Sequence, residues 1–304
     1  MRVLRDPFNR PVTSLRISLT HRCNFRCFFC HMEGEQDCRR ELSTTEIEKI
    51  VMVASSLGMR KVKLTGGEPL LREDIIEIVR RITPHVDEVS MTSNGFYLEE
   101  YAEKLYEAGL KRVNVSLHSL DQQIFEKITG VNAVEKVKKG IKAAVKSGLK
   151  PVKINMVVLK GLNDKDIPRM IEFSKNCGAI LQLIEFQPIQ YGAPYWKKFY
   201  YDLSLVEEEL KENSKDVLVR ELQRRRQYYL RNGGIVEIVK PMHNSSFCMN
   251  CTRLRVTADG KLKPCLMRND NLVDVKPILE SHDLKELEKA FEEAVSRREP
   301  YWKG

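Results

Sequence analysis

Residues 15–30, LRISLTHRCNFRCFFC, decide the fold, because a short strand-like run leads directly into a loop with three cysteines. The run LRISLT alternates apolar and polar side chains with the period of two of a β-strand. Cys23, Cys27 and Cys30 then follow with the spacing C-x3-C-x2-C. Barrel enzymes build their active sites at the carboxyl ends of parallel strands. A cysteine loop at this point therefore indicates a site for chemistry.

Three thiolates can hold three irons of a [4Fe–4S] cluster and leave the fourth iron open for a ligand. Bacterial ferredoxin runs have the tighter spacing C-x2-C-x2-C and a fourth cysteine, so they transfer electrons without an open iron. Zinc is the alternative, but three cysteines would need a fourth ligand such as His21 or His31. The spacing favours a catalytic cluster over zinc.

Strand-like and helix-like segments alternate along residues 15–187. The β-rich runs are LRISLT (15–20), KVKLT (61–65), EVSMTSN (88–94), RVNVSLH (112–118), PVKINMVVL (151–159) and LQLIEFQ (181–187). Intervening segments such as 43–58 and 95–109 carry apolar residues at helical spacing and end on glycine. This alternation is typical of parallel βαβ units. The sequence therefore predicts an α/β fold with a barrel-like or open parallel sheet.

One face of each predicted strand is polar, whereas a parallel sheet covered on both sides would be apolar on both faces. The polar positions are Arg16/Ser18/Thr20, Lys61/Lys63/Thr65, Ser90/Thr92/Asn94, Asn114/Ser116/His118, Lys153/Asn155 and Glu185/Gln187. The alternate positions are apolar and can pack against helices. The polar face is thus expected to line a hydrated or ligand-filled interior.

The alternating pattern ends near residue 190, which divides the chain into a predicted barrel of residues 1–190 and an extension of residues 191–304. Within the extension, residues 196–213 predict a linker and a helix, and residues 218–240 predict a hairpin-like or irregular segment. A last helix is expected over residues 282–298.

A second cysteine group lies in the extension, where Cys248, Cys251 and Cys265 have the spacing C-x2-C-x13-C. Three thiolates again leave one coordination position open. A zinc ribbon would look similar but needs a fourth ligand, and His243 is the only one nearby. In the intervening TRLR, Arg253 and Arg255 point to the same side if the segment is extended, and guanidinium groups suit phosphate.

Composition is that of a globular protein, since the 304 residues are 42% hydrophobic and 31% charged. The formal charge of +9 is compatible with an acidic ligand, either a phosphorylated small molecule or nucleic acid. Solvated helix faces, on which Lys and Arg recur beside Glu, are the preferred explanation for much of this charge. No run has the apolar length of a transmembrane helix, and the first residues do not form a signal peptide, so a cytoplasmic location is expected. Disulfides are not expected there, and Cys38 and Cys177 are interpreted as bystanders.

The cysteine loop after the first strand resembles the signature of the radical S-adenosylmethionine (SAM) superfamily. The resemblance implies a partial (β/α)6 barrel of TIM type, SAM chelated at the open iron, and SAM cleavage to methionine and a 5′-deoxyadenosyl radical. The segment LTGGEPLL, residues 64–71, resembles the one that binds the SAM amino group. The SAM contacts implied by the resemblance are Phe29, Gly67, Ser116 and Gln187.

Segments along nearly the whole chain resemble, in order, the GTP 3′,8-cyclase (MoaA) family of molybdenum cofactor biosynthesis. They include KVKLTGGEPLLRED (61–74), KINMVVLKGLND (153–164) and SFCMNCTRLRVTADGKLKPC (246–265). This resemblance implies that a second [4Fe–4S] cluster in the extension binds guanine. The radical would remove the hydrogen at ribose C3′, and C3′ would attack guanine C8 to give 3′,8-cyclo-7,8-dihydro-GTP, the first step of molybdopterin biosynthesis.

The same resemblance implies the substrate site and the partners. The GTP contacts would be Arg16, Lys63, Thr92, Lys153, Arg253, Leu254 and Arg255. An external electron donor would reduce the protein, and the product would pass to cyclic pyranopterin monophosphate synthase. No nucleic acid or membrane partner is expected, and the chain would be a monomer or a homodimer.

Three positions depart from the family pattern. The family usually ends in Gly-Gly, with a tail that reaches the active site, whereas this chain ends in Trp302-Lys303-Gly304. Gln187 stands where many members have methionine, and Lys63 replaces a common arginine. Two alternatives stay open at this point: another radical SAM enzyme with an auxiliary cluster that modifies a peptide, and a basic nucleic-acid-binding module that contains zinc or a cluster.

Overall fold

A continuous sheet organises the computed structural model, which describes residues 2–35, 40–281 and 283–303. The strands are β1 Ser14–Ser18, β2 Lys61–Thr65, β3 Glu88–Ser93, β4 Arg112–Ser116, β5 Val152–Val158, β6 Ile180–Glu185, β7 Ser214–Val219, β8 Arg226–Leu230, β9 Ile235–Val239, β10 Arg253–Val256, β11 Lys261–Lys263 and β12 Val273–Asp274. Their order in the sheet is β12-β11-β10-β1-β2-β3-β4-β5-β6-β9-β8-β7.

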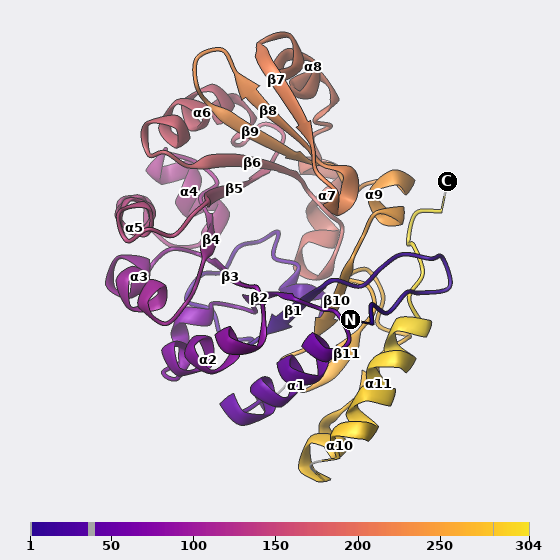
Figure 1. Ribbon diagram of the computed structural model, residues 1–304. Coiled ribbons are helices and arrows are strands. Elements are labelled where there is room, and N and C mark those ends of the chain that lie inside the picture. Colours follow the sequence, from indigo (N-terminus) through magenta and orange to yellow (C-terminus); the bar gives the residue numbers. More distant parts are fainter. Residues whose placement is uncertain (1, 36–39, 282, 304) are drawn as a thin grey trace.

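Strands β1 to β6 are the six predicted strands, and each pairs in parallel with the next. Figure 1 shows the sheet curving around an interior, with the helices that connect these strands on its outer side. Strands β12 and β7 stand at opposite ends of the strand order, so within the described residues the sheet is not closed. The prediction of a partial (β/α)6 barrel is confirmed.

The helices follow the capping and burial patterns of the sequence. They are α1 Thr44–Ser56, α2 Ile75–Ile82, α3 Leu98–Glu107, α4 Gln122–Thr129, α5 Val134–Lys146, α6 Ile167–Asn176, α7 Trp196–Phe199, α8 Ser204–Glu212, α9 Ser245–Met249, α10 Lys276–Ser281 and α11 Leu284–Ser296, with short 3₁₀ helices η1 Met32–Gly34, η2 Pro69–Leu71, η3 Thr83–His85, η4 Asp164–Asp166, η5 Gln190–Tyr195 and η6 Leu222–Arg224. Helix α1 begins with a capping box between Ser43 and Glu46, and Asp283 caps α11. The helix predicted over residues 282–298 is therefore α11, while His282 lies outside the described residues.

The apolar strand positions form the core between the sheet and its helices. Leu15, Ile17, Val62 and Leu64, for example, are each at most 1% exposed. Each buried side chain of this size contributes about 1.5–3 kcal/mol to folding. The opposite side chains of the same strands are consequently left to face the interior of the barrel.

The register of β6 corrects one of the predicted inward positions. Asn155 pairs with Gln182, and Gln182 pairs with Glu237 of β9, so these three side chains share the inner face. Strand alternation then places Glu185 on the outer face, where its carboxylate accepts a hydrogen bond from the Met242 N–H at 3.4 Å. The prediction for Glu185 was wrong because β6 has polar residues on both faces, and the sequence alone did not show which face continues that of β5.

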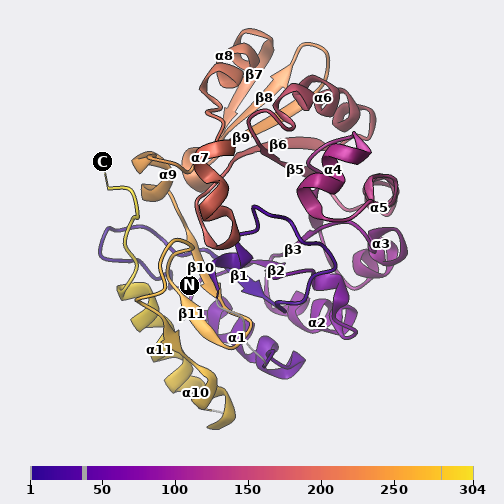
Figure 2. The same cartoon turned by 180° about the vertical axis from the view of Figure 1, so that it is seen from behind.

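The extension adds strands to both edges of the barrel sheet. The predicted hairpin is β8 and β9, which together with β7 adjoin β6, whereas β10 to β12 adjoin β1 (Figure 2). The two edges meet through the loop between β7 and β8, where the Gln223 N–H donates to the Asn250 carbonyl at 2.8 Å. A boundary at residue 190 remains a prediction, since residues on either side of it share one sheet.

Candidate active site

The first cysteine loop covers the carboxyl end of β1 and is fixed by backbone hydrogen bonds to the end of α4. The Arg26 N–H donates to the Thr129 carbonyl at 2.8 Å, and the Phe28 N–H donates to the Ile128 carbonyl at 3.3 Å. Cys23, Cys27 and Cys30 are free thiols on this loop. The loop therefore holds its three sulfurs at the edge of the sheet where the sequence predicted a site.

The chemistry of this donor set fits an iron–sulfur cluster. Cys27 and Cys30 are half-buried and Cys23 is exposed at the edge of the loop. Partial removal from water raises the pKa of all three thiols, that of Cys23 to about 11. The three thiolates therefore need a cationic partner, which iron provides. The Phe25 N–H and the Asn94 amide donate to the Cys23 sulfur at 3.4 and 3.8 Å. Within the described residues, no three His, Cys, Asp or Glu side chains lie close enough together to bind a single metal ion.

The imidazoles that could have completed a zinc site have other partners. His21 Nε2 lies 2.7 Å from Glu35 Oε2. The Glu33 N–H donates to His31 Nδ1 at 3.0 Å. Both rings thus take part in the structure of the loop.

The glycines of the GGEP segment pack against the backbone of the cysteine loop. A Cβ on Gly66 would lie 2.5 Å from the Thr20 carbonyl oxygen, and one on Gly67 would lie 2.2 Å from that of Arg22. The Gly67 N–H also donates to the Thr20 carbonyl at 2.6 Å. These glycines therefore allow the close approach of the GGEP segment to the cysteine loop. The SAM contact of Gly67 remains a prediction.

Glu68 of the same segment is fully buried, and its hydrogen bonds stabilise the backbone around the site. Its carboxylate accepts hydrogen bonds from the Asn94 N–H at 2.6 Å, the Ser93 hydroxyl at 2.9 Å and the Leu70 N–H at 3.1 Å. Burial raises the pKa of Glu68 to about 7 despite these bonds. Glu68 thereby ties the end of β3, including the Asn94 that reaches Cys23, to the GGEP segment.

We expect Gly67→Ala to displace the first cysteine loop, because the clashing atom belongs to the backbone and cannot turn aside. Iron bound after anaerobic reconstitution should fall from about eight to about four per chain. Gly161→Ala is the control, since its Cβ would meet nothing within 4 Å; it should cost only about 1 kcal/mol of backbone strain. Full iron content and an unchanged melting temperature in Gly67→Ala would contradict this account.

The other predicted SAM contacts lie around the carboxyl ends of β4 and β6. The Phe29 ring packs edge-on against His118 with centroids 4.8 Å apart, and against Phe186 at 6.3 Å. Ser116 ends β4 and pairs with Asn155. Gln187 follows β6 and is half-buried. Their roles toward SAM remain predictions.

Three predicted substrate contacts stand side by side inside the barrel. Arg255 of β10 pairs with Arg16 of β1, which pairs with Lys63 of β2. Leu254 lies between Arg253 and Arg255, and its side chain is fully buried on the opposite face, so only its backbone can take part in a site. Thr92 pairs with Asn114 on the neighbouring strands.

Glu33, which the sequence analysis did not identify, bridges two of these cations. Its carboxylate lies 2.9 Å from Arg16 Nη2 and 2.6 Å from Arg255 Nη1, and accepts from the Thr65 hydroxyl at 2.9 Å. Burial alone would raise the pKa of Glu33, but the two guanidinium groups lower it to about 2. Its position three residues after Cys30 is the only signal that the sequence offered.

Lys63 and Arg253 differ from their neighbours because neither contacts a carboxylate among the described residues. Lys63 Nζ donates to the Asn114 amide oxygen at 2.7 Å. Burial lowers the pKa of Lys63 well below its ordinary value, and Arg112, Arg16 and Arg253 add to this effect. Both side chains are half-buried, and positive charges partly removed from water without a counter-ion are costly. These two side chains therefore favour an anionic ligand.

The second cysteine group lies at the end of the barrel opposite the first. Cys251 precedes β10, which runs parallel to β1, and Cys265 follows β11, which runs antiparallel to β10. Both cysteines thus lie toward the amino end of β1, whereas the first loop follows its carboxyl end. The two cysteine groups are separated by the length of β1, which has five residues that each advance the strand by about 3.3 Å. The inward cations occupy the space between the two cysteine groups.

A buried ionic network holds the second loop. Asp6 Oδ2 lies 2.7 Å from Arg10 Nε and 2.9 Å from Arg298 Nη1. Arg10 donates to the Cys248 carbonyl at 2.8 Å, and Arg298 donates to the Cys251 carbonyl at 2.7 Å. Burial would raise the pKa of the Cys251 thiol, but Arg298 and Arg253 hold it below its ordinary value. The two ends of the chain together position the loop, and its thiols fit a second cluster.

We expect Asp6→Ala to destabilise the protein by about 3–5 kcal/mol, because it leaves two arginines buried without their carboxylate. Anaerobic thermal unfolding measures the change. Asp87→Ala is the control, since Asp87 pairs with Arg60 at 2.6 Å but its side chain is 61% exposed; it should cost less than about 1 kcal/mol. Equal melting temperatures for the two variants would show that the buried network is not needed.

The C-terminal tail lies at the second group. The Trp302 and His243 rings pack with centroids 4.2 Å apart. Burial raises the pKa of Cys248, and the backbone N–H groups of Trp302 and Tyr301 oppose this shift. The His243 ring thus packs, tilted, against Trp302 beside the second cysteine group.

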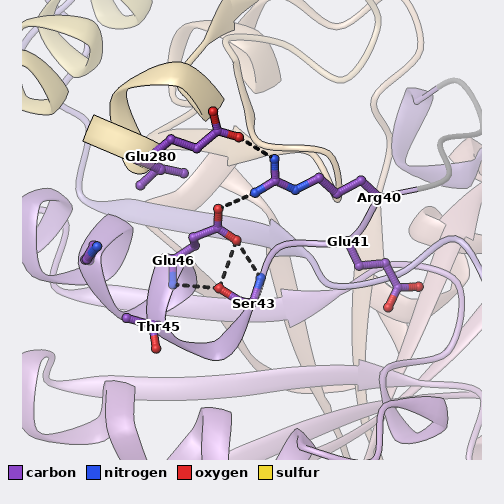
Figure 3. A pocket seen from close by; sticks show the side chains of 8 residues that line it. Arg40, Glu41, Ser43, Thr45, Glu46 and Glu280 are labelled. Carbon is purple, nitrogen blue, oxygen red and sulfur yellow. Dashed lines mark hydrogen bonds and ion pairs between the residues drawn. The ribbon is translucent and has the colours of Figure 1, made fainter. Parts of the chain in front are cut away.

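Two further features do not belong to this site. Figure 3 shows a surface pocket in which Arg40 pairs with Glu46 at 2.6 Å and with Glu280 at 2.8 Å. Cys177 ends α6 and packs against the core, in agreement with its interpretation as a bystander. Cys38 lies outside the described residues.

Comparison with known proteins finds a matching family for the barrel, which carries the first cysteine group, and for the extension, which carries the second. Residues 17–174 match the radical SAM superfamily, and residues 179–304 match the family described as Molybdenum Cofactor Synthesis C. A probable GTP 3′,8-cyclase of Thermococcus kodakarensis is 52% identical, and the match covers 99% of this chain and 100% of the relative. The chain belongs to the GTP 3′,8-cyclase family. A further relative of the same name, from Pyrococcus abyssi, is 49% identical, with 99% of this chain and 100% of the relative covered.

Solved structures show the same fold at low sequence identity. Streptococcus suis SuiB bound to the precursor peptide SuiA has a TM-score of 0.69 at 18% identity, covering 91% of this chain and 64% of SuiB. The protein anSMEcpe with bound AdoMet has a TM-score of 0.62 at 18% identity, covering 93% of this chain and 82% of that one. These similarities establish the radical SAM fold and nothing about the substrate.

Membership in the GTP 3′,8-cyclase family decides between the alternatives left by the sequence. The chain is a radical SAM enzyme that uses SAM and a [4Fe–4S] cluster, and its extension fits a second cluster. The nucleic-acid-binding module and the peptide-modifying enzyme are therefore set aside. Among the described residues, no helix is long and apolar enough to cross a membrane.

Proposed function

We propose that this chain converts GTP into 3′,8-cyclo-7,8-dihydro-GTP, the first step of molybdopterin biosynthesis. The observation that carries the proposal is the pair of half-buried cations, Lys63 and Arg253, which have no carboxylate partner among the described residues. A triphosphate supplies the missing negative charge. A peptide substrate does not require such a set of cations.

The residues of the chain bind and orient the nucleotide in this proposal. The phosphates are held inside the barrel by Lys63, Arg253 and their inward neighbours. Away from bulk water, each attraction between a phosphate and a cation is stronger than it would be at the surface. The first cluster and SAM supply, when bound, the 5′-deoxyadenosyl radical that takes the hydrogen from ribose C3′. Fixing the ribose and guanine relative to each other contributes several kcal/mol to lowering the barrier, roughly 7–11 in favourable cases.

The remaining partners follow from the same reaction. The chain needs an external electron donor for the first cluster, and its product passes to cyclic pyranopterin monophosphate synthase. We place the reaction in the cytoplasm, since the described cysteines are free thiols and a reducing compartment keeps them so.

Anaerobic turnover tests the proposal. Reconstituted protein is incubated with SAM, GTP and dithionite, and the products are identified by mass spectrometry. The proposal predicts a cyclised nucleotide together with 5′-deoxyadenosine. Formation of 5′-deoxyadenosine without a cyclised product would retain the radical SAM chemistry and reject GTP as the substrate.

A further inference from the structure

Glu237 of β9 is a fully buried carboxylate that holds three cations. It pairs with Lys153, with Arg220 Nη1 at 2.9 Å and with Arg225 Nη1 at 2.9 Å. Gln182 of β6 donates to the same carboxylate at 2.6 Å and fixes its orientation. Burial alone would raise the pKa of Glu237, but the cations hold it below its usual range. Glu237 thus stays ionised and organises the group.

The group keeps an excess of positive charge, since three cations share one carboxylate. Among the described residues, Arg225 forms its ion pair with Glu237, and the Arg225 side chain is only 9% exposed. The Arg225 guanidinium uses Nη1 for Glu237, and its Nε lies 3.5 Å from the Leu222 carbonyl. Among the described residues, Nη2 has no hydrogen-bond partner, and it is not one of their fully buried unpaired atoms, so it is open to solvent. One edge of the guanidinium is thus left for a further acceptor.

The position of Arg225 connects two predicted phosphate contacts. Lys153 shares the Glu237 carboxylate with it. On its other side, Arg225 lies two residues after Gln223, and Arg253 lies three residues after Asn250. The hydrogen bond from Gln223 to Asn250 ties the Arg225 loop to the second cysteine segment. Arg225 therefore stands where cations from both edges of the sheet meet.

We propose that Arg225 is a further ligand of the nucleotide triphosphate and that Glu237 is the residue that positions it. This inference rests on the proposed function and deepens it. A phosphate oxygen beside Arg225 and Arg253 receives a charge-assisted hydrogen bond from each and removes their mutual repulsion. Gln182 and Glu237 hold the guanidinium plane in place before the nucleotide arrives, which lowers the entropy lost on binding.

Binding measurements with Arg225→Gln test the ligand role. The anaerobically reconstituted protein is titrated with GTP and, separately, with guanosine. Loss of hydrogen bonds to a charged group should weaken GTP binding about ten- to hundredfold, while guanosine binding stays within about twofold because guanosine has no phosphate. Arg224→Gln is the matched control, since Arg224 lies on the same loop with an exposed side chain, and it should leave both affinities unchanged.

Glu237→Gln tests the positioning role by the sign of its effect. Removal of a negative charge beside phosphate would tighten GTP binding if Glu237 acted only through its charge. Positioning predicts the reverse, a severalfold weaker affinity for GTP with guanosine binding unchanged. Iron content and the melting temperature establish that each variant is folded, and Arg225→Lys, which keeps the charge without the planar fork, should recover part of the loss.

The outcomes separate this inference from the proposed function. If the wild-type protein cyclises GTP but Arg225→Gln binds GTP as tightly as wild type, or loses GTP and guanosine equally, Arg225 is not a phosphate ligand and the proposed function stands. If the wild-type protein neither binds nor cyclises GTP, both are overturned.

Discussion

Cys27→Ala is expected to abolish both the formation of 5′-deoxyadenosine and the cyclisation of GTP. We propose that Cys23, Cys27 and Cys30 hold the first cluster, so that loss of Cys27 leaves an iron without its thiolate. Because the loop is anchored to α4 through the backbone of Arg26 and Phe28, the substitution should remove the ligand without moving the loop. Product analysis and an iron assay, falling from about eight to about four irons per chain, measure the effect.

Cys177→Ala is the matched control, because Cys177 is also a partly buried thiol but packs against the core at the end of α6. It should keep its iron and its activity. Full 5′-deoxyadenosine formation by Cys27→Ala would show that the first loop does not hold the cluster that cleaves SAM.

Cys251→Ala is expected to separate the two half-reactions. The second cysteine group lies at the opposite end of β1, so the first cluster and its SAM site should remain intact. The variant should still release 5′-deoxyadenosine in the presence of dithionite, but form no cyclised nucleotide. Mass spectrometry of both products from one reaction measures this uncoupling.

The assignment of the two loops fails if Cys251→Ala cyclises GTP at the wild-type rate. It fails equally if this variant loses SAM cleavage while its first cluster remains spectroscopically intact. Iron should again fall to about four per chain, so the difference between Cys27→Ala and Cys251→Ala lies in their products and not in their metal content.

Strand positions could be predicted well, because period-two alternation is a local property of the backbone. The predicted run 61–65 is β2 itself, and the predicted run 15–20 contains most of β1. Strand β6 was the exception, since it carries polar residues on both faces and only its pairing with β5 shows which face is inward. The position of the extension's strands at both edges of the sheet likewise depends on pairings far apart in sequence.

The predicted cations were brought together, but the carboxylates that organise them were missed. Glu33 pairs with Arg255, Glu237 with Lys153 and Asp6 with Arg298. The partners in these three pairs lie far apart in the sequence, so no spacing pattern reveals the pairs. Glu237 did leave one signal, a single charged residue within the apolar run IVEIV, residues 235–239. A charge at the buried face of a strand requires partners, and this requirement would have directed attention to nearby Arg220 and Arg225.

The central claim is that a radical generated at the first cysteine loop acts on the ribose of GTP held between the two groups. GTP carrying deuterium at ribose C3′ tests it most directly, in an anaerobic reaction with SAM and dithionite. The account predicts that 5′-deoxyadenosine acquires one deuterium while the cyclised nucleotide loses it. Unlabelled 5′-deoxyadenosine, with all deuterium retained in the nucleotide, would contradict the account.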